Sequence, residues 1–432
     1  MAVKILTETL APLDKLKPLE LSEENAQSLF KKMNTSVGFM KYGEKKRDMI
    51  PEMIEGAQYI KQELIKGTRY KDVITNPSIA LTRSQLGSLT KDEKYMYPWK
   101  EDPKGKYKGR LVFGEDGEVI AFEAQYARVA TDYVAEKWSN IATGKSPRRL
   151  RSIVIPIGDC PYWVSIDFSN FDASVQSWII ALAFKIVKSL FPDECANELD
   201  FICYKFTNMD ILMPDGNIYS KKKGIPSGSY FTQLIGSIVN AIMITTFMLH
   251  LVEGNIADFN AKFRLRNGQL SFICMGDDNI FGSQLEIDLE YMAKYFRKMF
   301  GMTLHPHKCA HGTWKDVPTF LKRDWHVEGE WRSPLELLLN VMHPERKRTY
   351  EGYSAWHILY GYWFTFRLGM EEIGFNESNI VRHIEQEGYR LRDILDMPLY
   401  DMPGSLQAFA RSDWEGWKNS ILNAEQRYCD VA

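Results

Sequence analysis

The sequence has few cysteines and no motif that pairs them. Its six cysteines are scattered without a CxxC pair or a zinc-ligand spacing, which excludes the common zinc-binding classes and is typical of a reducing compartment. The N-terminal residues contain no apolar segment long enough for a signal peptide. The apolar stretch at 353–370 is too short and too interrupted by polar residues to span a bilayer. We therefore expect a soluble protein without a membrane partner, either intracellular or enclosed in a particle.

The sequence also lacks an excess of charge of either sign. Lysine and arginine total 54, aspartate and glutamate total 56, and the formal net charge is -2, which disfavours an extended basic surface of the kind that binds nucleic acid. Basic residues are instead concentrated in three clusters, at Lys100, Lys104, Lys106, Lys108 and Arg110, at Lys145, Arg148, Arg149 and Arg151, and at Arg346, Lys347 and Arg348. Each cluster alone is most simply a solvated surface, whereas together they are compatible with a basic channel inside a neutral exterior.

Repeats and low-complexity tracts are absent, and 432 residues exceed one ordinary core, so we expect two or three subdomains. Hydrophobic patterns predict strands at 110–113, 117–122 and 162–168, and a hairpin of 270–274 and 280–281 around the four-residue turn 276–279. Helical spacing predicts helices at 175–190, 230–251 and 286–300, the last ended by Gly301, and a mainly helical region from residue 336 onward. This order favours an α+β fold in which helices cover one face of an antiparallel sheet.

Aspartates occur at the end of a predicted strand and in the predicted hairpin turn. Asp167 ends the strand region, Asp172 lies five residues later, and Asp277 and Asp278 occupy the turn. Carboxylates at such positions suit hard cations such as Mg²⁺, with Mn²⁺ as a substitute, and two ions about 3.5–4 Å apart activate a hydroxyl and stabilise a leaving pyrophosphate. The alternative is local chemistry: Gly-Asp-Asp arises by chance in about one chain in ten of this length, and Asp172 or Ser174 can cap the following helix.

A glycine-bearing loop leads into the second predicted helix. It runs from Gly224 to Gln233, and Gly228 permits backbone angles that other residues avoid. Ser227 and Thr232 each carry a hydroxyl that can hydrogen-bond to a backbone group or to a sugar. The simpler interpretation of this loop is an N-terminal helix cap.

These segments resemble, in the same order, the palm motifs of viral RNA-dependent RNA polymerases. Residues 167–172 match the first motif, D-x-x-x-x-D, residues 224–228 with Thr232 match the second, and residues 275–278 match the third. Downstream, Lys308 matches the fourth-motif lysine, and Phe320-Leu-Lys-Arg323 matches the fifth motif, the hairpin that holds the primer strand. Upstream, Lys108 and Arg110, with Glu123 beyond them, match the basic fingers motif. The run 226–233 with Ser237 and Asn240, and residues 343–346, are similar to the partitivirus and picobirnavirus group of double-stranded RNA viruses.

The resemblance implies a right-hand polymerase with fingers, palm and thumb. The fingers would comprise residues 1–155 with an insertion at 192–223, the palm residues 156–191 and 224–335, and the mainly helical thumb residues 336–432. The implied function is template-directed RNA synthesis from ribonucleoside triphosphates by two-metal-ion nucleotidyl transfer, which replicates and transcribes a viral RNA genome. RNA template and product would be partners, together with viral capsid protein, and the protein would act in the virion interior or the host cytoplasm.

The resemblance also implies roles for individual residues. Asp167, Asp277 and Asp278 would hold Mg²⁺, and Lys308 would act as general acid toward the leaving pyrophosphate, with His305 and His307 as rival proton donors. The incoming nucleotide would be bound by Lys108, Arg110, Asp172, Ser227, Gly228, Thr232, Ser237 and Asn240. Lys322 and Arg323 would contact RNA at the primer strand.

One position departs from the family pattern. Many of these polymerases place an asparagine four residues after the second-motif threonine to read the ribose 2′-hydroxyl, but here that position is Gly236. Asn240 lies one helical turn further along the same face, and Ser237 is adjacent. Asn240 and Ser237 are therefore both candidates for the partner of Asp172 in sugar selection.

Two other functions compete with RNA synthesis. A reverse transcriptase usually carries an aromatic residue before the paired aspartates and a bulky residue that blocks the 2′-hydroxyl, whereas Gly276 precedes Asp277 here. A non-catalytic RNA-packaging protein with structural cation sites would bind RNA without incorporating any nucleotide. Comparing ribonucleotide with deoxyribonucleotide use separates the first alternative, and incorporation itself separates the second.

Overall fold

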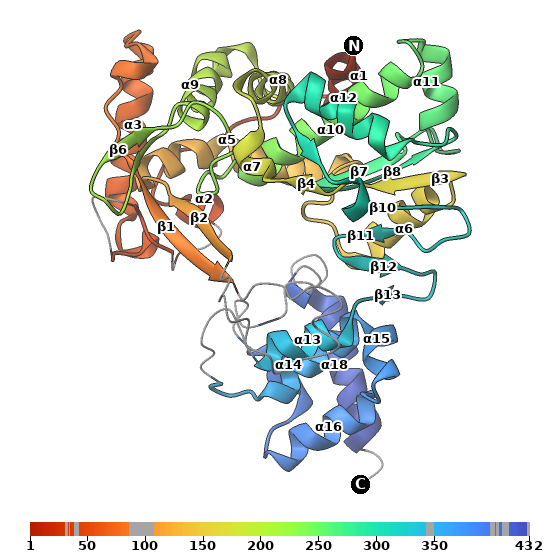
Figure 1. Cartoon of the computed structure of the whole chain (residues 1–432). Helices are drawn as coiled ribbons and strands as arrows, with labels where there is room; N and C mark the ends of the chain where they lie inside the picture. Colours follow the sequence, from red (N-terminus) through yellow and green to blue (C-terminus); the bar gives the residue numbers. More distant parts are fainter. Residues whose placement is uncertain are drawn as a thin grey trace. The chain divides into compact units, whose positions relative to one another are not determined.

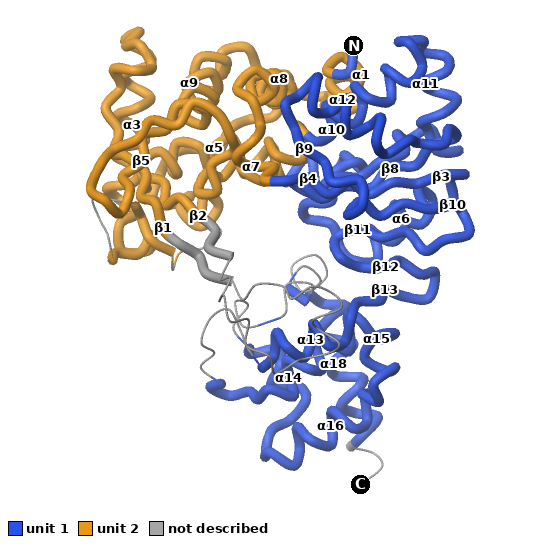
Figure 2. Tube along the Cα trace, viewed as in Figure 1, with its two compact units in different colours: residues 1–2, 132–169, 240–432 blue, residues 3–131, 170–239 orange. Residues whose placement is uncertain are grey.

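The computed structural model describes residues 1–30, 33, 35–38, 43–85, 108–342, 350–397, 402, 406–407 and 414–429, with the side chains of 82–85, 108–110 and 429 outside this description. The chain forms two compact units (Figure 2). Unit 1 contains residues 1–2, 132–169 and 240–432, and unit 2 contains residues 3–131 and 170–239. Each unit is thus assembled from segments that are distant in the sequence, and the division into fingers, palm and thumb stays a prediction.

The sheet of unit 2 has four strands in the order β2-β1-β5-β6 (Figure 1). β1 (Ser78–Gln85) pairs antiparallel with β2 (Lys108–Gly114) and parallel with β5 (Asp210–Leu212), and β5 pairs antiparallel with β6 (Ile218–Ser220). β2 therefore confirms the strand predicted at 110–113 and extends it at both ends.

The other strand predicted in this region, at 117–122, is wrong. These residues begin the long helix α5 (Gly117–Lys137). Its buried side chains recur with helical spacing over three turns, at Phe122, Tyr126, Ala130 and Val134. The apolar face of the complete helix therefore outweighs the local preference of the β-branched residues for a strand.

The helix predicted at 175–190 is confirmed as α8 (Ser177–Lys188), but neither Asp172 nor Ser174 caps it. Its N-cap is Gln176, whose side chain makes no capping hydrogen bond. Asp172 and Ser174 lie instead inside the short helix α7 (Phe171–Ser174). The remaining helices in this part of the chain are α1 (Ala2–Leu10), α2 (Ala26–Leu29), η1 (Lys46–Asp48), α3 (Ile50–Ile65), η2 (Tyr70–Asp72), η3 (Asp193–Cys195) and α9 (Ala196–Thr207).

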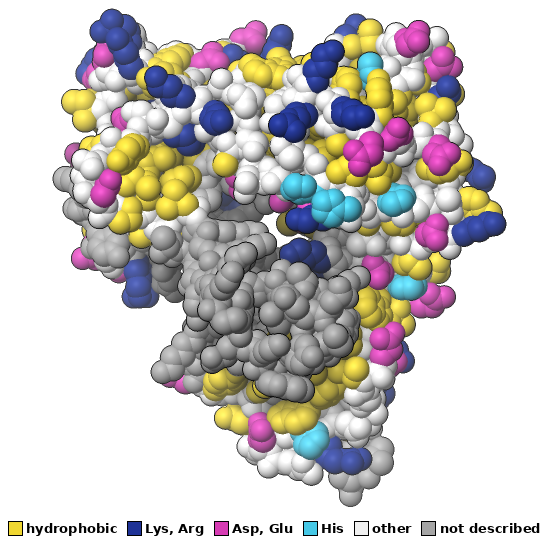
Figure 3. All heavy atoms as spheres, in the orientation of Figure 1, with side chains coloured by type: hydrophobic (Ala, Val, Ile, Leu, Met, Phe, Trp, Pro, Cys, Tyr) yellow, Lys and Arg dark blue, Asp and Glu magenta, His cyan; other side chains and the backbone are white. Residues whose placement is uncertain are grey.

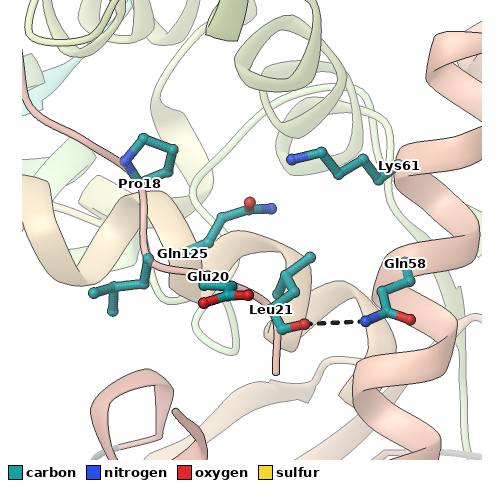
Figure 4. A pocket seen from close by; sticks show the side chains of 7 residues that line it. Pro18, Glu20, Leu21, Gln58, Lys61 and Gln125 are labelled. Carbon is teal, nitrogen blue, oxygen red and sulfur yellow. Dashed lines mark hydrogen bonds between the residues drawn. The ribbon is translucent and has the colours of Figure 1, made fainter. Parts of the chain in front are cut away.

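An N-terminal segment, residues 15–21, is fastened to several elements of unit 2. Leu16 N donates to Leu190 O at 2.8 Å, and Leu19 N donates to Gln125 O at 2.9 Å. Gln58 Nε2 donates to Leu21 O at 3.0 Å, across a pocket lined by Pro18, Leu19, Glu20, Leu21, Gln58, Lys61 and Gln125 (Figure 4). The segment thereby connects α3, α5 and the end of α8, which are far apart in the sequence.

The central sheet of unit 1 is antiparallel, with the strand order β10-β3-β8-β7 (Figure 1). Its strands are β3 (Tyr162–Ser165), β7 (Phe272–Met275), β8 (Asp278–Ser283) and β10 (Ala310–Thr313). β4 (Phe168–Ser169), which follows β3 in the chain, forms a separate short antiparallel pair with β9 (Thr303–Leu304). The hairpin and the antiparallel α+β layer predicted from the sequence are confirmed.

Helices cover both faces of this sheet, so the prediction of a single covered face is wrong. On one face, Val154 and Ile157 of α6 (Pro147–Gly158) pack with Ile280 of β8. On the other face lie α11 (Ile256–Phe263), α12 (Leu289–Phe300) and the later part of α10 (Thr232–Leu251), as Figure 1 shows. Successive side chains of a strand point to opposite faces, and Phe281 is as fully buried as its neighbour Ile280, so both faces need a cover.

The helix predicted at 286–300 is confirmed as α12, with a later start. Asp288 caps it by accepting hydrogen bonds from Glu290 N and Tyr291 N, and Gly301, with φ 68°, ends it as predicted. Phe296 of α12 packs against Phe247 of α10 at a ring-centroid distance of 5.7 Å. This aromatic contact joins the two helices on the same side of the sheet.

The C-terminal region is mainly helical, as predicted. It contains α13 (Pro334–Met342), α14 (Ala355–Thr365), α15 (Arg367–Glu372), α16 (Glu377–Gln386), η5 (Leu391–Leu395) and α18 (Trp414–Cys429). These helices bury a shared apolar core that includes Tyr360, Ile384 and Trp417. A three-stranded sheet of β11 (Thr319–Phe320), β12 (Arg323–Trp325) and β13 (Glu330–Trp331) precedes them in the chain.

α10 is the one helix, within the described ranges, that has the length and composition of a membrane span. In its most apolar window 83% of the residues are buried inside the fold, which is typical of a core helix.

On the face shown in Figure 3, the described lysine and arginine side chains are interspersed with aspartate and glutamate rather than gathered in one area. This distribution agrees with the formal net charge of -2.

Candidate active site

The acidic hairpin is tighter than the sequence predicted. Met275 pairs with Asp278, so the loop between β7 and β8 has only two residues, Gly276 and Asp277. Gly276 has φ 64°, a conformation that glycine adopts readily and that two-residue hairpins require at their first loop position. The predicted four-residue turn 276–279 is therefore wrong, because Asp278 and Asn279 already belong to β8.

The structure brings the predicted metal-binding carboxylates together at one end of the central sheet. Asp167 follows β3, and both Asp167 and Asp277 are exposed, whereas Asp278 is partly buried. Burial is the main reason why the pKa of Asp278 is raised to about 6. The negative charge of Asp277 raises this pKa too, the positive charge of Lys322 lowers it, and Asp167 raises it. The four side chains therefore act on one another electrostatically.

The donors at this site suit a divalent cation. All three are carboxylates, the hard oxygen ligands that Mg²⁺ and Mn²⁺ prefer. Burial raises the pKa of Asp278 most, and the repulsion from Asp277 and Asp167 that adds to it is a penalty that a bound cation would relieve. Within the described part of the chain, no three His, Cys, Asp or Glu side chains already converge as a complete metal-binding cluster. The residues fit a divalent cation by the chemistry of their oxygen donors.

Lys308 lies where the sequence predicted, after the helix α12 and the short strand β9. It ends the single-turn helix η4 (Pro306–Lys308), and its side chain is exposed. His305 and His307 precede it closely in the chain, and their ring centroids lie 5.6 Å apart. The histidines therefore remain close enough in the chain to compete with Lys308 as proton donors.

Lys322 and Arg323 have different surroundings. Leu321 and Lys322 form a two-residue turn between β11 and β12, and both have positive φ, 56° and 57°. Lys322 is exposed at this turn. Arg323 is only 13% exposed, lies 3.8 Å from a carboxylate oxygen of Glu330, and stacks over the ring of Phe366 at 5.0 Å. The turn presents Lys322 to solvent, whereas Arg323 is held inside the protein.

The glycine-bearing loop of unit 2 is tied to β2. Phe113 N donates to Ser227 Oγ at 3.0 Å, and a Cβ on Gly228 would lie 2.3 Å from Phe113 O. In this loop the glycine with a positive φ is Gly224, at 84°, and not Gly228. Position 228 therefore requires glycine because the backbone of β2 approaches it closely, and not because of unusual backbone angles. Thr232 Oγ1 donates back to Ser229 O at 2.7 Å. The loop and the strand that carries Lys108 and Arg110 thus form one piece, although those two side chains lie outside the described residues.

A buried carboxylate supports the same loop. Glu123 of α5 accepts hydrogen bonds from Ser229 Oγ at 2.7 Å and Tyr230 N at 2.9 Å. Burial raises the pKa of Glu123 to about 7, against the lowering effect of these hydrogen bonds and of Lys46. In the sequence, only the position of Glu123 beyond Arg110 pointed to a role, because its loop contact depends on packing that no local pattern reports.

The candidate sugar-selecting residues are divided between the units. Asp172 is exposed on α7 in unit 2. Ser237 is buried, and its hydroxyl donates to Gln233 O one helical turn earlier at 2.7 Å. Asn240, in unit 1, donates from Nδ2 to Gly276 O at 2.9 Å and Asp277 O at 3.1 Å. The structure thus brings Asn240 to the acidic hairpin.

Sequence comparison identifies the family. The model of the viral RNA-dependent RNA polymerase family matches residues 1–351, so the chain belongs to that family. Over 227 residues the chain is 32% identical to the RNA-directed RNA polymerase of Cryptosporidium parvum virus 1 (strain KSU-1), covering 49% of this chain and 39% of that protein. It is 24% identical over 313 residues to the genome polyprotein of Human rhinovirus 16, covering 69% of this chain and 13% of the polyprotein.

Solved structures confirm the right-hand polymerase fold. The chain is similar to the RNA-dependent RNA polymerase of a human picobirnavirus, with a TM-score of 0.61 and 16% identity, covering 99% of this chain and 73% of that one. The insertion-loop deletion mutant of that polymerase gives a TM-score of 0.62 at 15% identity and covers 100% of this chain and 76% of that chain. At this level of identity the likeness concerns the fold, whereas the family membership rests on the sequence match.

Proposed function

We propose that this protein synthesises RNA on an RNA template from ribonucleoside triphosphates. The observation that carries the proposal is that Asp167, Asp277 and Asp278 lie near enough at one end of the central sheet to act on one another electrostatically, in a chain of the viral RNA-dependent RNA polymerase family. Phosphoryl transfer is catalysed mainly by positioning and by neutralising negative charge. A set of carboxylates from two separate chain segments, after β3 and in the β7–β8 hairpin, provides the anchor that such neutralisation needs.

Asp167, Asp277 and Asp278 would hold Mg²⁺, with Mn²⁺ as a substitute. When bound, these ions would supply activation of the primer 3′-hydroxyl and stabilisation of the leaving pyrophosphate. The chain's own task is to fix the ligands: the two-residue loop holds Asp277, and the end of β3 holds Asp167. Asp278 is the more buried ligand and would contribute less directly.

The nucleotide would be bound by β2 and the loop attached to it. Lys108 and Arg110 lie on β2 and would contact the triphosphate, for which the planar guanidinium fork is suited. The contacts of Ser227 and Gly228 with Phe113 support this proposal, because they couple the loop to the basic strand. Thr232 would contribute by holding the loop backbone.

Ribose would be distinguished from deoxyribose by Asp172 with Asn240 or Ser237. Asn240 Oδ1 is buried and makes no hydrogen bond within the described residues, which leaves it as an acceptor. A site built to bond a hydroxyl rejects an analogue that lacks it, because its own polar groups are then unpaired.

The exposed basic residues of unit 1 would act on the other reacting groups. Lys308 would donate a proton to the leaving pyrophosphate, as general acid. Lys322, exposed at its turn, would contact the RNA backbone, and Arg323 would support that turn from inside. We further propose RNA and viral capsid protein as partners, and the virion interior or host cytoplasm as the location.

Incubation of the pure protein with a homopolymer RNA template, labelled ribonucleotides and Mg²⁺ or Mn²⁺ tests the proposal. We expect template-length product from the wild type and none from a folded Asp277→Asn variant. RNA binding without incorporation by the wild type would contradict the proposal and favour an RNA-packaging protein. Preferred use of deoxyribonucleotides would instead indicate a reverse transcriptase.

A further inference from the structure

The side chain of Asn279 bridges the two chain segments that carry the candidate metal ligands, one after β3 and the other in the β7–β8 hairpin. The antiparallel pairing of β3 with β8 extends to Val164 opposite Phe281. Two residues after Val164, just beyond the end of β3, Ile166 N donates to the side-chain Oδ1 of Asn279 at 3.2 Å instead of to a backbone carbonyl. Asn279 Nδ2 donates to Asp277 O at 3.2 Å. One fully buried amide therefore bonds to the residue that precedes Asp167 and to Asp277 itself.

A second buried amide holds the same loop from α10. Asn240 Nδ2 donates to Gly276 O and Asp277 O, the carbonyls of both loop residues. The Asp277 carbonyl therefore accepts from two asparagine amides, at 3.1 and 3.2 Å. Ser165 Oγ adds a bond to Asn279 O at 2.7 Å. The loop is fixed from the adjoining strand and from a helix at once.

The chemistry of an amide suits this position. The site gathers negative charge, and the carboxylates repel one another, so a carboxylate at position 279 would add to the repulsion. An amide supplies both a donor and an acceptor without any charge. It can thus bridge an N–H on one side and a carbonyl on the other, which a lysine or a hydrophobic residue cannot do.

We propose that Asn279 and Asn240 are positioning residues that set the separation of Asp167 and Asp277 for divalent-cation binding. This inference rests on the proposed function of the acidic hairpin. The two amides offset the carboxylate repulsion through uncharged hydrogen bonds, so the ligands are held near each other before a cation arrives. Loss of an outer residue that orients metal ligands typically weakens metal binding by about 10- to 100-fold.

The chain offers a matched control for a merely structural asparagine. Asn140 is also buried, and its Nδ2 also donates to two backbone carbonyls, Leu270 O at 2.9 Å and Phe272 O at 2.6 Å. These carbonyls lie at the start of β7, away from the loop end of that strand. Asn140→Ala and Asn279→Ala should therefore lower the melting temperature similarly, while only Asn279→Ala should affect cation binding.

The test measures Mn²⁺ binding to the full chain, without RNA or nucleotide, from the loss of the free-ion electron paramagnetic resonance signal. We expect about 10-fold weaker Mn²⁺ binding in Asn279→Ala and Asn240→Ala, and wild-type binding in Asn140→Ala. If Asn279→Ala does not fold, Ser165→Ala, which removes one bond to Asn279, should give a smaller weakening and decides together with Asn240→Ala. In RNA synthesis, the Mg²⁺ concentration for half-maximal rate should rise in parallel while RNA binding is unchanged.

The outcomes separate this inference from the proposed function. Equal Mn²⁺ binding by wild type, Asn279→Ala and Asn240→Ala, in a wild type that synthesises RNA, would overturn the positioning role alone. Wild-type protein that incorporates no nucleotide would overturn the proposed function. Weaker Mn²⁺ binding in Asn140→Ala of the same size would also overturn the inference, because any loss of stability would then suffice.

Discussion

Replacement of Gly228 by alanine should abolish most RNA synthesis, for a reason that the backbone geometry makes explicit. A Cβ at this position would lie 2.3 Å from Phe113 O and 3.0 Å from Glu115 N. Both atoms belong to the backbone at the end of β2, so neither can rotate away as the end of a side chain would. The gap to Phe113 O must open beyond 3.0 Å, and the loop or the strand must shift to allow it.

The size of the effect follows from that shift. Overpacking of this kind costs about 1–3 kcal/mol of stability, and separation of the loop from β2 also weakens the hydrogen bond from Phe113 N to Ser227 Oγ, which is worth about 1 kcal/mol. Misplacement of a substrate-positioning group by about 1 Å can cost about 100-fold in rate. We therefore expect a moderate loss of stability together with a loss of activity of roughly that order.

Gly216→Ala is the control for this prediction. Gly216 has φ 82° in the β5–β6 turn, and a Cβ there meets nothing within 4 Å. Alanine at such a φ costs about 1–2 kcal/mol, so the two variants should have comparable urea-unfolding midpoints. Steady-state incorporation should fall only in Gly228→Ala. Equal activities at equal stability would refute the argument that loop and strand must remain in contact.

Three further predictions concern single side chains. Asp277→Asn should abolish incorporation and Asp278→Asn should reduce it less, as template-extension assays on folded variants will show; retained activity in Asp277→Asn would rule out its role as a metal ligand. Lys308→Ala should slow single-turnover incorporation by about 10- to 1000-fold, with a smaller change in nucleotide KM. An unchanged rate in this variant, together with a large loss of rate in His307→Ala, would assign the role of general acid to the histidine. Burial raises the pKa of Glu123 from 4.5 to about 7. The wild type should therefore lose stability relative to Glu123→Gln as pH rises through that window, by up to about 3 kcal/mol. An equal pH dependence of the free energy of urea unfolding in the two proteins would contradict the burial argument.

The sequence was sufficient for features that depend on neighbouring residues. The Gly-Asp-Asp turn, the helix ended by Gly301 and the place of Lys308 after a strand are local patterns, and the structure contains each of them. The length of the turn was wrong, because the pairing of Met275 with Asp278 depends on how far two strands remain in register. The start of α5 was wrong for the opposite reason: six residues looked like a strand, while burial along the whole helix decided the outcome.

The contacts that hold the site could not be predicted from one sequence. Asn279 matters because β3 lies beside β8, and more than a hundred residues separate Ile166 from it. Asn240 was expected to contact a sugar, and its bonds to the acidic hairpin arise only from the packing of α10 next to β7 and β8. Residue type alone identifies neither asparagine, since asparagine is common in turns and caps for unrelated reasons.

The enclosure of Arg323 has a consequence for how RNA binding should respond to salt. Each phosphate that a protein cation neutralises releases condensed counterions, and this release makes the logarithm of the affinity fall with the logarithm of salt concentration by about 0.7 per contact for single strands. Arg323 is only 13% exposed and its charge faces Glu330, so we expect it to neutralise no phosphate and to release no counterion. In the proposed RNA contact, Lys322 would contribute its share at the same turn because it is exposed. We therefore predict that this hairpin contributes one cation to the ionic-strength dependence of RNA affinity, rather than the two that its sequence contains.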